Sequence, residues 1–249
     1  MKNIAIVLAA GQGKRMQTVV PKQFLTLGKE PMMMKSLRVF EKSDIIDEII
    51  LVVSKDYMDE SKKLVKKADL HKVKKIIAGG SERYESVYEG LQVCSNCRYV
   101  FIHDSARPYV DKDIIRRAYY AVKENPAVAV GMPSKDTVKL VDEDGFVKDT
   151  PARSSVWIIQ TPQVFRYELI KKAYDKQMKE ENGMDNITDD AMVVERSGLA
   201  KVSLVEGSYE NIKITTPDDM DVKDKEKKKD KDKKKDKDKD GKDKDKKKK

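Results

Sequence analysis

Two glycines and two cations near the start of the chain are residue types that can bind a polyphosphate. Gly11 and Gly13 follow an apolar run, and Arg15 and Lys22 come shortly after them. Small residues let backbone N–H groups approach phosphate oxygens closely, and the cations can neutralise their charge. The segment lacks the third glycine of a dinucleotide-binding fingerprint and the Gly-Lys-Ser/Thr of a P-loop. By itself it indicates either a triphosphate site or a tight strand–helix connection with surface cations.

A carboxylate after a second apolar run has the chemistry of a magnesium ligand. Asp104 follows this run within the sequence His-Asp-Ser-Ala-Arg-Pro. Mg²⁺ keeps several waters and takes one or two carboxylates together with phosphate oxygens, so Asp104 can face a metal bound to a triphosphate. The alternative is a structural ion pair between Asp104 and Arg107. We expect His103 to be a packing residue rather than an acid–base group.

A third segment combines glycines with hydroxyl side chains at the start of a helical pattern. Gly79-Gly80-Ser81 comes first, and Ser86 follows within the helix. Ser81 or Ser86 can cap the helix, and N–H groups left free there can bind base or phosphate oxygens. This segment is therefore another candidate for the nucleotide site.

Alternating strand and helix patterns must position these three segments. Strands are expected at 3–8, 48–53, 75–77, 99–102, 127–132, 201–205 and 211–215, and helices near 32–40, 62–68, 82–93, 114–122, 166–178 and 189–197. The alternation predicts an α/β, Rossmann-like fold with a mostly parallel sheet and helices on both faces. Ligands of such sheets bind beyond the carboxyl ends of the strands, where the candidate segments lie.

The alternation breaks at Pro133, and the chain changes character again after Val222. Residues 134–156 read as two short strands around Asp144-Gly145, which predicts a projecting hairpin arm within a single domain at 1–222. Residues 223–249 contain only Lys, Asp, Glu and one Gly. This tail has no apolar residue to offset a backbone ordering cost of roughly 1–2 kcal/mol per residue, so we expect it to be disordered.

The net charge of +9 lies almost entirely in this tail. Residues 223–249 carry 17 Lys and nine acidic residues, which leaves the rest of the chain at +1. The folded domain therefore gives no indication of specific nucleic-acid binding. Cys94 and Cys97 lack further zinc ligands at suitable spacing and suit reduced thiols in the cytoplasm. Neither a membrane span nor a signal peptide is expected.

The order and spelling of these segments resemble the sugar-phosphate cytidylyltransferases, in particular the 2-C-methyl-D-erythritol 4-phosphate cytidylyltransferase family. The resemblance begins with Leu8-Ala9-Ala10-Gly11 and Pro21-Lys22-Gln23 and covers roughly residues 3–220. It implies the fold of the nucleotide-diphospho-sugar transferases and the transfer of CMP from CTP to a polyol phosphate, with Mg²⁺ as cofactor. It also implies a homodimer formed through the arm.

The resemblance further implies a role for each matching residue. Arg15 and Lys22 would stabilise the transition state. Thr137 and Arg153 would reach from the arm of one subunit to the sugar phosphate in the other subunit's site. The remaining acceptor-positioning residues would be Lys213, Thr161 and Arg107. The nucleotide would be bound by Ala9, Ala10, Gly11, Gly13, Gly80, Ser81, Ser86, Asp104 and Ser105, with Asp104 also facing the metal.

Three other functions stay open at this point. A ribitol-5-phosphate cytidylyltransferase shares much of this motif set. Three segments favour the methylerythritol enzyme, namely Ala9-Ala10-Gly11, Lys135-Asp136-Thr137 and Thr188-Asp189-Asp190-Ala191. A non-catalytic nucleotide-binding protein would be expected to have lost the charged site residues, which are all present. A nucleic-acid binder acting through the tail would show strongly salt-dependent binding.

Overall fold

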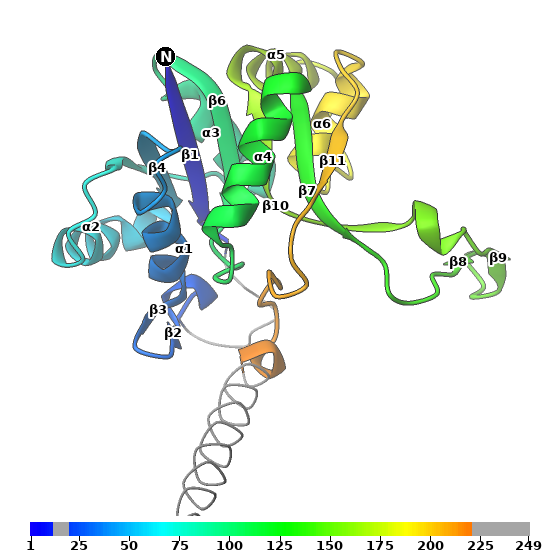
Figure 1. Cartoon of the computed structure of the whole chain (residues 1–249), viewed down its shortest axis with the longest axis horizontal. Helices are drawn as coiled ribbons and strands as arrows, with labels where there is room; N and C mark the ends of the chain where they lie inside the picture. Colours follow the sequence, from blue (N-terminus) through cyan, green and yellow to red (C-terminus); the bar gives the residue numbers. More distant parts are fainter. Residues whose placement is uncertain (12–19, 221–249) are drawn as a thin grey trace, which may run out of the picture.

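A seven-stranded sheet of order β11-β7-β10-β6-β1-β4-β5 forms the centre of the protein (Figure 1). The structure is a computed structural model that describes residues 1–11 and 20–220. The strands are β1 (Lys2–Ala9), β4 (Glu48–Val53), β5 (Val73–Ala78), β6 (Cys97–Asp104), β7 (Ala127–Pro133), β10 (Trp157–Arg166) and β11 (Ser203–Glu206). Neighbouring strands are parallel except that β10 is antiparallel to both β6 and β7. The predicted fold class is therefore confirmed.

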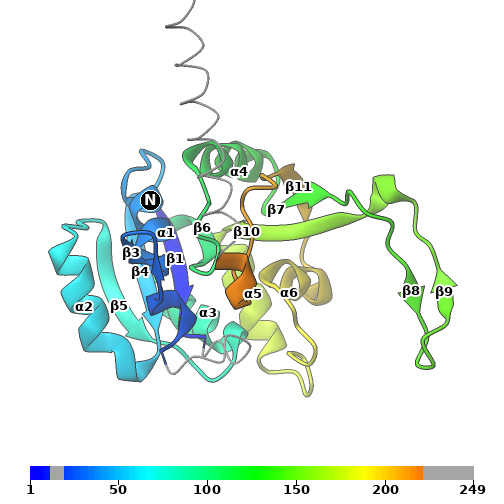
Figure 2. The same cartoon turned by 90° about the horizontal axis from the view of Figure 1, so that it is seen from below.

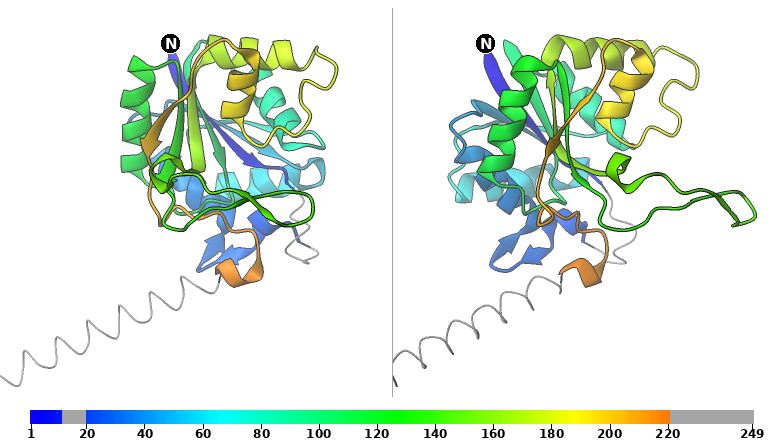
Figure 3. Two further views of the ribbon diagram at one scale, coloured as in Figure 1. Left: turned by 90° about the vertical axis from the view of Figure 1, so that its right-hand side faces the viewer. Right: turned by 45° about the vertical axis from the view of Figure 1, so that its right-hand side comes forward.

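Helices cover both faces of the sheet. The pattern of β1 explains this, because Ala5 and Val7 pack in the core under α1, α2 and α4, whereas Ile4 and Ile6 pack in the core under α3, α5 and α6. Successive side chains of a strand point to opposite faces, so an uninterrupted apolar strand is buried on both. Figure 3 shows α4 (green) and α6 (gold) on opposite sides of the strands. The helices are α1 (Met32–Glu41), α2 (Met58–Lys67), α3 (Arg83–Gln92), α4 (Lys112–Glu124), α5 (Tyr167–Gln177) and α6 (Asp190–Ser197).

The strand order reverses at β1, and this creates the ligand crevice. The chain passes from β1 to β4 and β5 on one side, then returns to place β6 on the other side of β1. Connections that leave in opposite directions open a crevice between the carboxyl ends of two such strands. Ala9 ends β1 and Asp104 ends β6, so both face this crevice. A small hairpin of β2 (Thr26–Leu27) and β3 (Glu30–Pro31) lies at the same end of the sheet.

The predicted hairpin arm is present and projects from the body of the protein (Figure 2). Its two short strands, β8 (Leu140–Val141) and β9 (Val147–Asp149), pair in antiparallel fashion. Gly145 lies between them with φ of +87°, a backbone conformation that glycine adopts without strain. Leu140 and Phe146 on the arm are exposed apolar side chains.

Two segments differ from the sequence prediction. Residues 157–166 form the strand β10, which contains a cis Thr161–Pro162 bond and a register shift between Ile159 and Gln163. The predicted strand at 211–215 is wrong, because those residues form no strand. Instead the N–H of Ile214 donates to the carbonyl of Ala106 at 2.8 Å, which ties this segment to the loop after β6.

The predicted tail at 223–249 lies outside the described residues, so its expected disorder stays a prediction. None of the helices within residues 1–11 and 20–220 is long and apolar enough to cross a membrane.

Candidate active site

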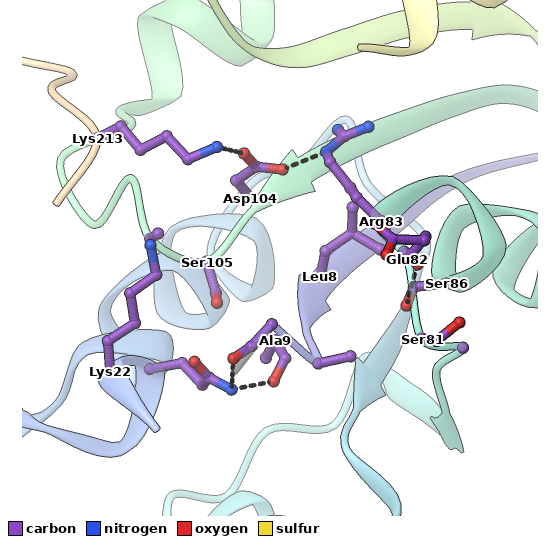
Figure 4. A pocket seen from close by; sticks show the side chains of 15 residues that line it. Leu8, Ala9, Lys22, Ser81, Glu82, Arg83, Ser86, Asp104, Ser105 and Lys213 are labelled. Atoms are coloured by element: carbon purple, nitrogen blue, oxygen red, sulfur yellow. Dashed lines mark hydrogen bonds and ion pairs between the residues drawn. The ribbon is translucent and has the colours of Figure 1, made fainter. Parts of the chain in front are cut away.

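A cavity of about 190 Å³ lies where β1 and β6 end (Figure 4). Its charged side chains come from parts of the chain that are remote in sequence. Lys22, Asp104 and Lys213 each come from a separate segment, and Glu82 and Arg83 from a fourth. The predicted residues that line it are Ala9, Ala10, Gly11, Lys22, Gly80, Ser81, Ser86, Asp104, Ser105 and Lys213. Gly13 and Arg15 fall in the segment 12–19, which lies outside the described residues. The tertiary fold thus gathers predicted nucleotide-binding residues around one cavity, together with the predicted transition-state residue Lys22 and the predicted acceptor-positioning residue Lys213.

Gln23 holds the first wall of this cavity in place. The Gln23 side chain is 2 % exposed, and its Nε2 donates to the carbonyls of Ala9 and Gly11. The neighbouring Lys22 turns the other way, and its Nζ donates to the carbonyl of Ile214 at 3.0 Å. The consecutive side chains of Lys22 and Gln23 therefore connect the segment at Ile214 with the backbone at Ala9 and Gly11.

The helix cap at the second wall differs from the prediction. Glu82, rather than Ser81 or Ser86, is the N-cap of α3, and it forms a capping box with Glu85. The N–H groups of Ser81 and Glu82 donate to the Glu85 carboxylate at 2.7 and 3.0 Å. The prediction that N–H groups at this helix start are free is therefore wrong for these two. Hydrogen bonds from Ser81 and Glu82 lower the pKa of Glu85 and keep this acceptor ionised.

Asp104 stands between two cations at the floor of the cavity. Its Oδ2 accepts from Lys213 Nζ at 2.7 Å, and its Oδ1 accepts from Arg83 Nε at 3.1 Å (Figure 4). Burial opposes ionisation of this carboxyl, but the charges of Arg83 and Lys213 outweigh it and hold the pKa of Asp104 well below its usual range. The alternative ion pair with Arg107 is not formed, since the Arg107 guanidinium donates to the carbonyls of Asn211 and Ile159.

His103 is fully buried and links β6 to β10. The Thr161 hydroxyl accepts from the N–H of Asp104 at 3.1 Å and lies 3.0 Å from His103 Nδ1. The Arg107 carbonyl can only accept, so His103 Nε2 carries a proton and donates to it at 3.2 Å, and Nδ1 of the neutral ring accepts from the Thr161 hydroxyl. This pattern fits a neutral ring. Burial lowers the pKa of His103 to about 4, in agreement with the predicted packing role.

A second cavity of about 250 Å³ adjoins the first. Arg83, Asp104 and Lys213 line both cavities, so they form the boundary between them. Two predicted acceptor-positioning residues, Arg107 and Thr161, line this second cavity. Arg107 Nε is buried without a hydrogen-bond partner, and burial lowers the pKa of this guanidinium.

The two predicted arm residues lie elsewhere. Thr137 and Arg153 are exposed, and the Arg153 guanidinium donates to the Thr137 hydroxyl at 3.4 Å. They are close to each other but line neither of the two cavities in their own chain. Their role at the site of another subunit stays a prediction.

Sequence reasoning gave no role to Arg83 and named Asp190 only as part of the motif at 188–191. Asp189 in this motif is the N-cap of α6, with its Oδ1 accepting from the N–H of Met192. Asp190 is instead buried and forms a bidentate pair with Arg83 at 3.0 and 2.8 Å. These two residues are 107 positions apart, so no local pattern could have revealed the pair.

The residues present suit a metal that arrives with phosphate ligands. Among the described residues, no group of three or more His, Cys, Asp or Glu side chains is arranged to hold a metal ion. Asp104 is an ionised carboxylate beside a cavity that is lined by glycine backbone, by cations and by one further acidic residue, Glu82. One carboxylate with waters and phosphate oxygens is a normal set of ligands for Mg²⁺.

Comparisons with known proteins agree on one family. The family model of 2-C-methyl-D-erythritol 4-phosphate cytidylyltransferase (IspD) matches residues 3–225. A relative of that name from Lachnospira eligens is 47% identical over 220 residues, which cover 88% of this chain and 96% of the relative. One from Clostridium botulinum strain 657 is 45% identical, with 88% and 94% covered.

Solved structures give the same result. The crystal structure of 4-diphosphocytidyl-2C-methyl-D-erythritol synthase from Anaerococcus prevotii has a TM-score of 0.78 and 35% identity, covering 88% of this chain and 92% of that one. The 2-C-methyl-D-erythritol 4-phosphate cytidylyltransferase of Francisella tularensis has a TM-score of 0.75 and 30% identity, with 90% and 99% covered.

Proposed function

The chain belongs to the 2-C-methyl-D-erythritol 4-phosphate cytidylyltransferase family, and we infer from this that it transfers CMP from CTP to 2-C-methyl-D-erythritol 4-phosphate with release of pyrophosphate. The observation that carries the inference is the convergence of Lys22, Asp104 and Lys213 on one cavity at the strand-order reversal. A protein that merely kept the fold would not need charges from three remote segments to meet. The family model and the relatives described above also carry the methylerythritol name rather than the ribitol one.

The first cavity suits the nucleotide. Backbone at Ala9 to Gly11 provides one wall, Gly80 and Ser81 the other, and Ser105 closes the floor beside Asp104. Lys22 and Lys213 would neutralise the triphosphate, together with Arg15. Asp104 would hold Mg²⁺, which neutralises phosphate charge and orients the triphosphate when bound.

The second cavity suits the acceptor. Arg107, Thr161 and Lys213 line it, and the orphaned Arg107 Nε offers a donor that the protein itself does not use. Because Lys213 and Asp104 form the boundary between the cavities, a phosphate in the second one would lie beside a triphosphate in the first. Thr137 and Arg153 would come from the arm of a partner subunit, which makes a homodimer part of this proposal. Guanidinium groups suit a phosphate dianion because they donate two parallel hydrogen bonds.

Positioning and charge neutralisation would supply most of the rate. An acceptor phosphate oxygen attacks the α-phosphorus of CTP in line, and pyrophosphate leaves. The acceptor is ionised at neutral pH, so the reaction needs no general base. The barrier is the approach of one anion to another, and Arg15 and Lys22 would stabilise the charge that develops. By analogy with removal of one oxyanion donor, Arg15→Ala should lower the rate about 10²–10³-fold.

The direct test measures pyrophosphate release by purified protein with CTP, Mg²⁺ and one acceptor at a time. We expect turnover with 2-C-methyl-D-erythritol 4-phosphate and little with ribitol 5-phosphate. Turnover with ribitol 5-phosphate alone would refute the acceptor assignment. Binding of CTP without pyrophosphate release from either acceptor would instead favour a non-catalytic nucleotide-binding protein.

Arg153→Ala tests the role of the arm. The variant should raise KM for the sugar phosphate and leave KM for CTP near its wild-type value, because Arg153 lines neither cavity of its own chain. Arg116→Ala is the control, since Arg116 is an exposed arginine on α4 that pairs only with Asp113 among the described acidic groups. Unchanged acceptor kinetics in Arg153→Ala would show that the assignment is wrong.

Mixed dimers show which subunit the arm serves. Arg153→Ala and Lys22→Ala subunits are unfolded, mixed in equal amounts and refolded together. If the arm crosses to the partner, each mixed dimer has one intact site, and the mixture should recover about a quarter of wild-type activity. No recovery from two folded, dimeric variants would place the arm on its own subunit's site.

A cytoplasmic location stays a prediction from the sequence.

A further inference from the structure

A chain of four side chains leads from the cavity floor into the protein core. Asp104 at the end of β6 accepts from Arg83, the first residue of α3. Arg83 directs its two terminal nitrogens to the carboxylate of Asp190, the first residue of α6, at 3.0 and 2.8 Å. Tyr174 on α5 then donates its hydroxyl to Asp190 Oδ1 at 2.7 Å. The Arg83 guanidinium therefore links α3 to β6 and α6 directly, and to α5 through Asp190.

The inner half of this chain is buried. Asp190 and Tyr174 are both 0 % exposed. Burial raises the pKa of Tyr174 well above its usual value, and Asp190 adds to this effect, so the hydroxyl stays a donor. Asp190 and Asp104 together outweigh the burial of Arg83 and raise the pKa of its guanidinium, so it stays charged. The Tyr174 hydroxyl and the Arg83 guanidinium are thus both in the protonated state that their hydrogen bonds need.

Stability alone does not explain a buried ion pair at this place. Taking two charges out of water costs several kcal/mol per ion, and well-packed apolar residues of similar volume often serve a core equally well. The pair instead fixes the orientation of the Arg83 guanidinium. With both terminal nitrogens bonded to Asp190, the Arg83 guanidinium is held so that its Nε donates to Asp104 Oδ1.

The second cation on Asp104 is held differently. The Lys213 side chain is 37 % exposed, and its ammonium is a single charge on a flexible stem. Arg83 is anchored from behind, whereas Lys213 can move toward a phosphate when one is bound. The two oxygens of Asp104 therefore have one fixed partner and one exchangeable partner.

We propose that Arg83, held by Asp190 and Tyr174, is a positioning residue that fixes the orientation of the Asp104 carboxylate for the metal-bound nucleotide. The inference rests on the proposed function and names residues to which that function assigns no role. Groups that orient a metal-binding carboxylate typically change metal affinity or activity 10–100-fold when they are lost. Arg83→Lys keeps the charge but cannot reach both carboxylates, so we expect about that loss of metal affinity. Tyr174→Phe removes one hydrogen bond from Asp190 and should lie near the lower end of the range.

Two matched controls separate positioning from folding. Tyr88→Phe removes the same kind of hydrogen bond, since Tyr88 donates to the Asp175 carboxylate at 2.9 Å and its ring stacks with that of Tyr174. Arg38→Lys alters another partly buried arginine–carboxylate pair, whose partner is Glu30 at 2.8 Å. Neither Asp175 nor Glu30 lines the two site cavities. Both controls should leave metal affinity at the wild-type value.

The experiment measures Mn²⁺ binding by electron paramagnetic resonance, with protein plus CTP compared against CTP alone. The Mg²⁺ dependence of kcat/KM and the thermal midpoint are measured on the same samples. We expect Arg83→Lys and Tyr174→Phe to weaken Mn²⁺ binding and raise the Mg²⁺ requirement, while the controls do neither. Tyr174→Phe keeps the buried ring, so it supplies a folded variant if Arg83→Lys does not fold.

The outcomes distinguish this inference from the proposed function. If the wild type binds no Mn²⁺ in the presence of CTP, the metal role of Asp104 is refuted and the inference falls with it. If the wild type binds Mn²⁺ and Tyr174→Phe lowers only the thermal midpoint, the proposed function stands and the positioning role is overturned. Equal losses of metal affinity in the site variants and their controls would overturn it as well.

Discussion

The protein should become markedly less stable in mild acid, because the folded state keeps His103 neutral whereas the unfolded chain protonates it. His103 is fully buried, and burial lowers its pKa from 6.5 to about 4. As the pH falls below 6.5, the unfolded chain binds a proton that the folded protein excludes until about pH 4. The unfolded state therefore binds more protons in this window, and the free energy of unfolding must decrease as the pH is lowered through it.

The size of the effect follows from the two pKa values. At each pH, the histidine changes the free energy of unfolding by RT times the logarithm of a ratio. The ratio compares the proton-binding polynomial of the folded protein with that of the unfolded chain. Between about pH 7.5 and about pH 5, one histidine of this type removes roughly 2 kcal/mol of folding free energy. Against a typical total of about 5–15 kcal/mol, this loss is readily measured.

Urea unfolding of the His103→Gln variant provides the assay. Wild type and variant are unfolded at both pH values, at one protein concentration and without added nucleotide or metal. His103→Gln should be less stable at the higher pH, because glutamine cannot bridge Thr161 and the Arg107 carbonyl as the ring does. Its additional loss in acid should be smaller than that of the wild type by roughly 2 kcal/mol.

His71→Gln is the matched control, because His71 is the other histidine of the chain and its side chain is 77 % exposed. This variant should lose as much stability in acid as the wild type. If His103→Gln and the wild type lose the same free energy between the two pH values, His103 does not titrate as a buried neutral ring. The reasoning from its burial would then be refuted.

Two glycines should separate folding from nucleotide binding. A Cβ at Gly90 of α3 would lie 2.8 Å from Cγ2 of the buried Ile6, so Gly90→Val should lower the unfolding free energy by about 1–3 kcal/mol; denaturant unfolding measures this, and an unchanged midpoint would contradict the close packing. A Cβ at Gly11 would meet no atom of the described residues within 4 Å although Gly11 lines the first cavity, so Gly11→Ala should keep its stability within about 0.5 kcal/mol and raise KM for CTP; a normal KM for CTP would argue against the nucleotide assignment of this cavity.

Local patterns were sufficient to predict much of the fold. The apolar run of β1 is buried on both faces because alternate side chains point to opposite sides of a strand. Asp144-Gly145 predicted the hairpin because the turn needs a positive φ that glycine supplies. The strand β10 was missed because Gln160, Thr161, Pro162 and Gln163 interrupt its apolar pattern. Gln160, Thr161 and Gln163 are buried but hydrogen-bonded to distant residues, so only the folded chain satisfies them.

The sequence by itself determined which residue types this protein has for binding a polyphosphate and which short segments carry them. The tertiary structure decided that Lys22, Asp104 and Lys213 share one cavity, and that Thr137 and Arg153 lie apart from it. It also revealed the pair of Arg83 and Asp190 across 107 residues. The physical reason is that hydrogen bonding and periodicity within a helix or strand act over a few neighbouring residues. Charges from distant segments meet only when the strand order and helix packing bring the ends of those elements together.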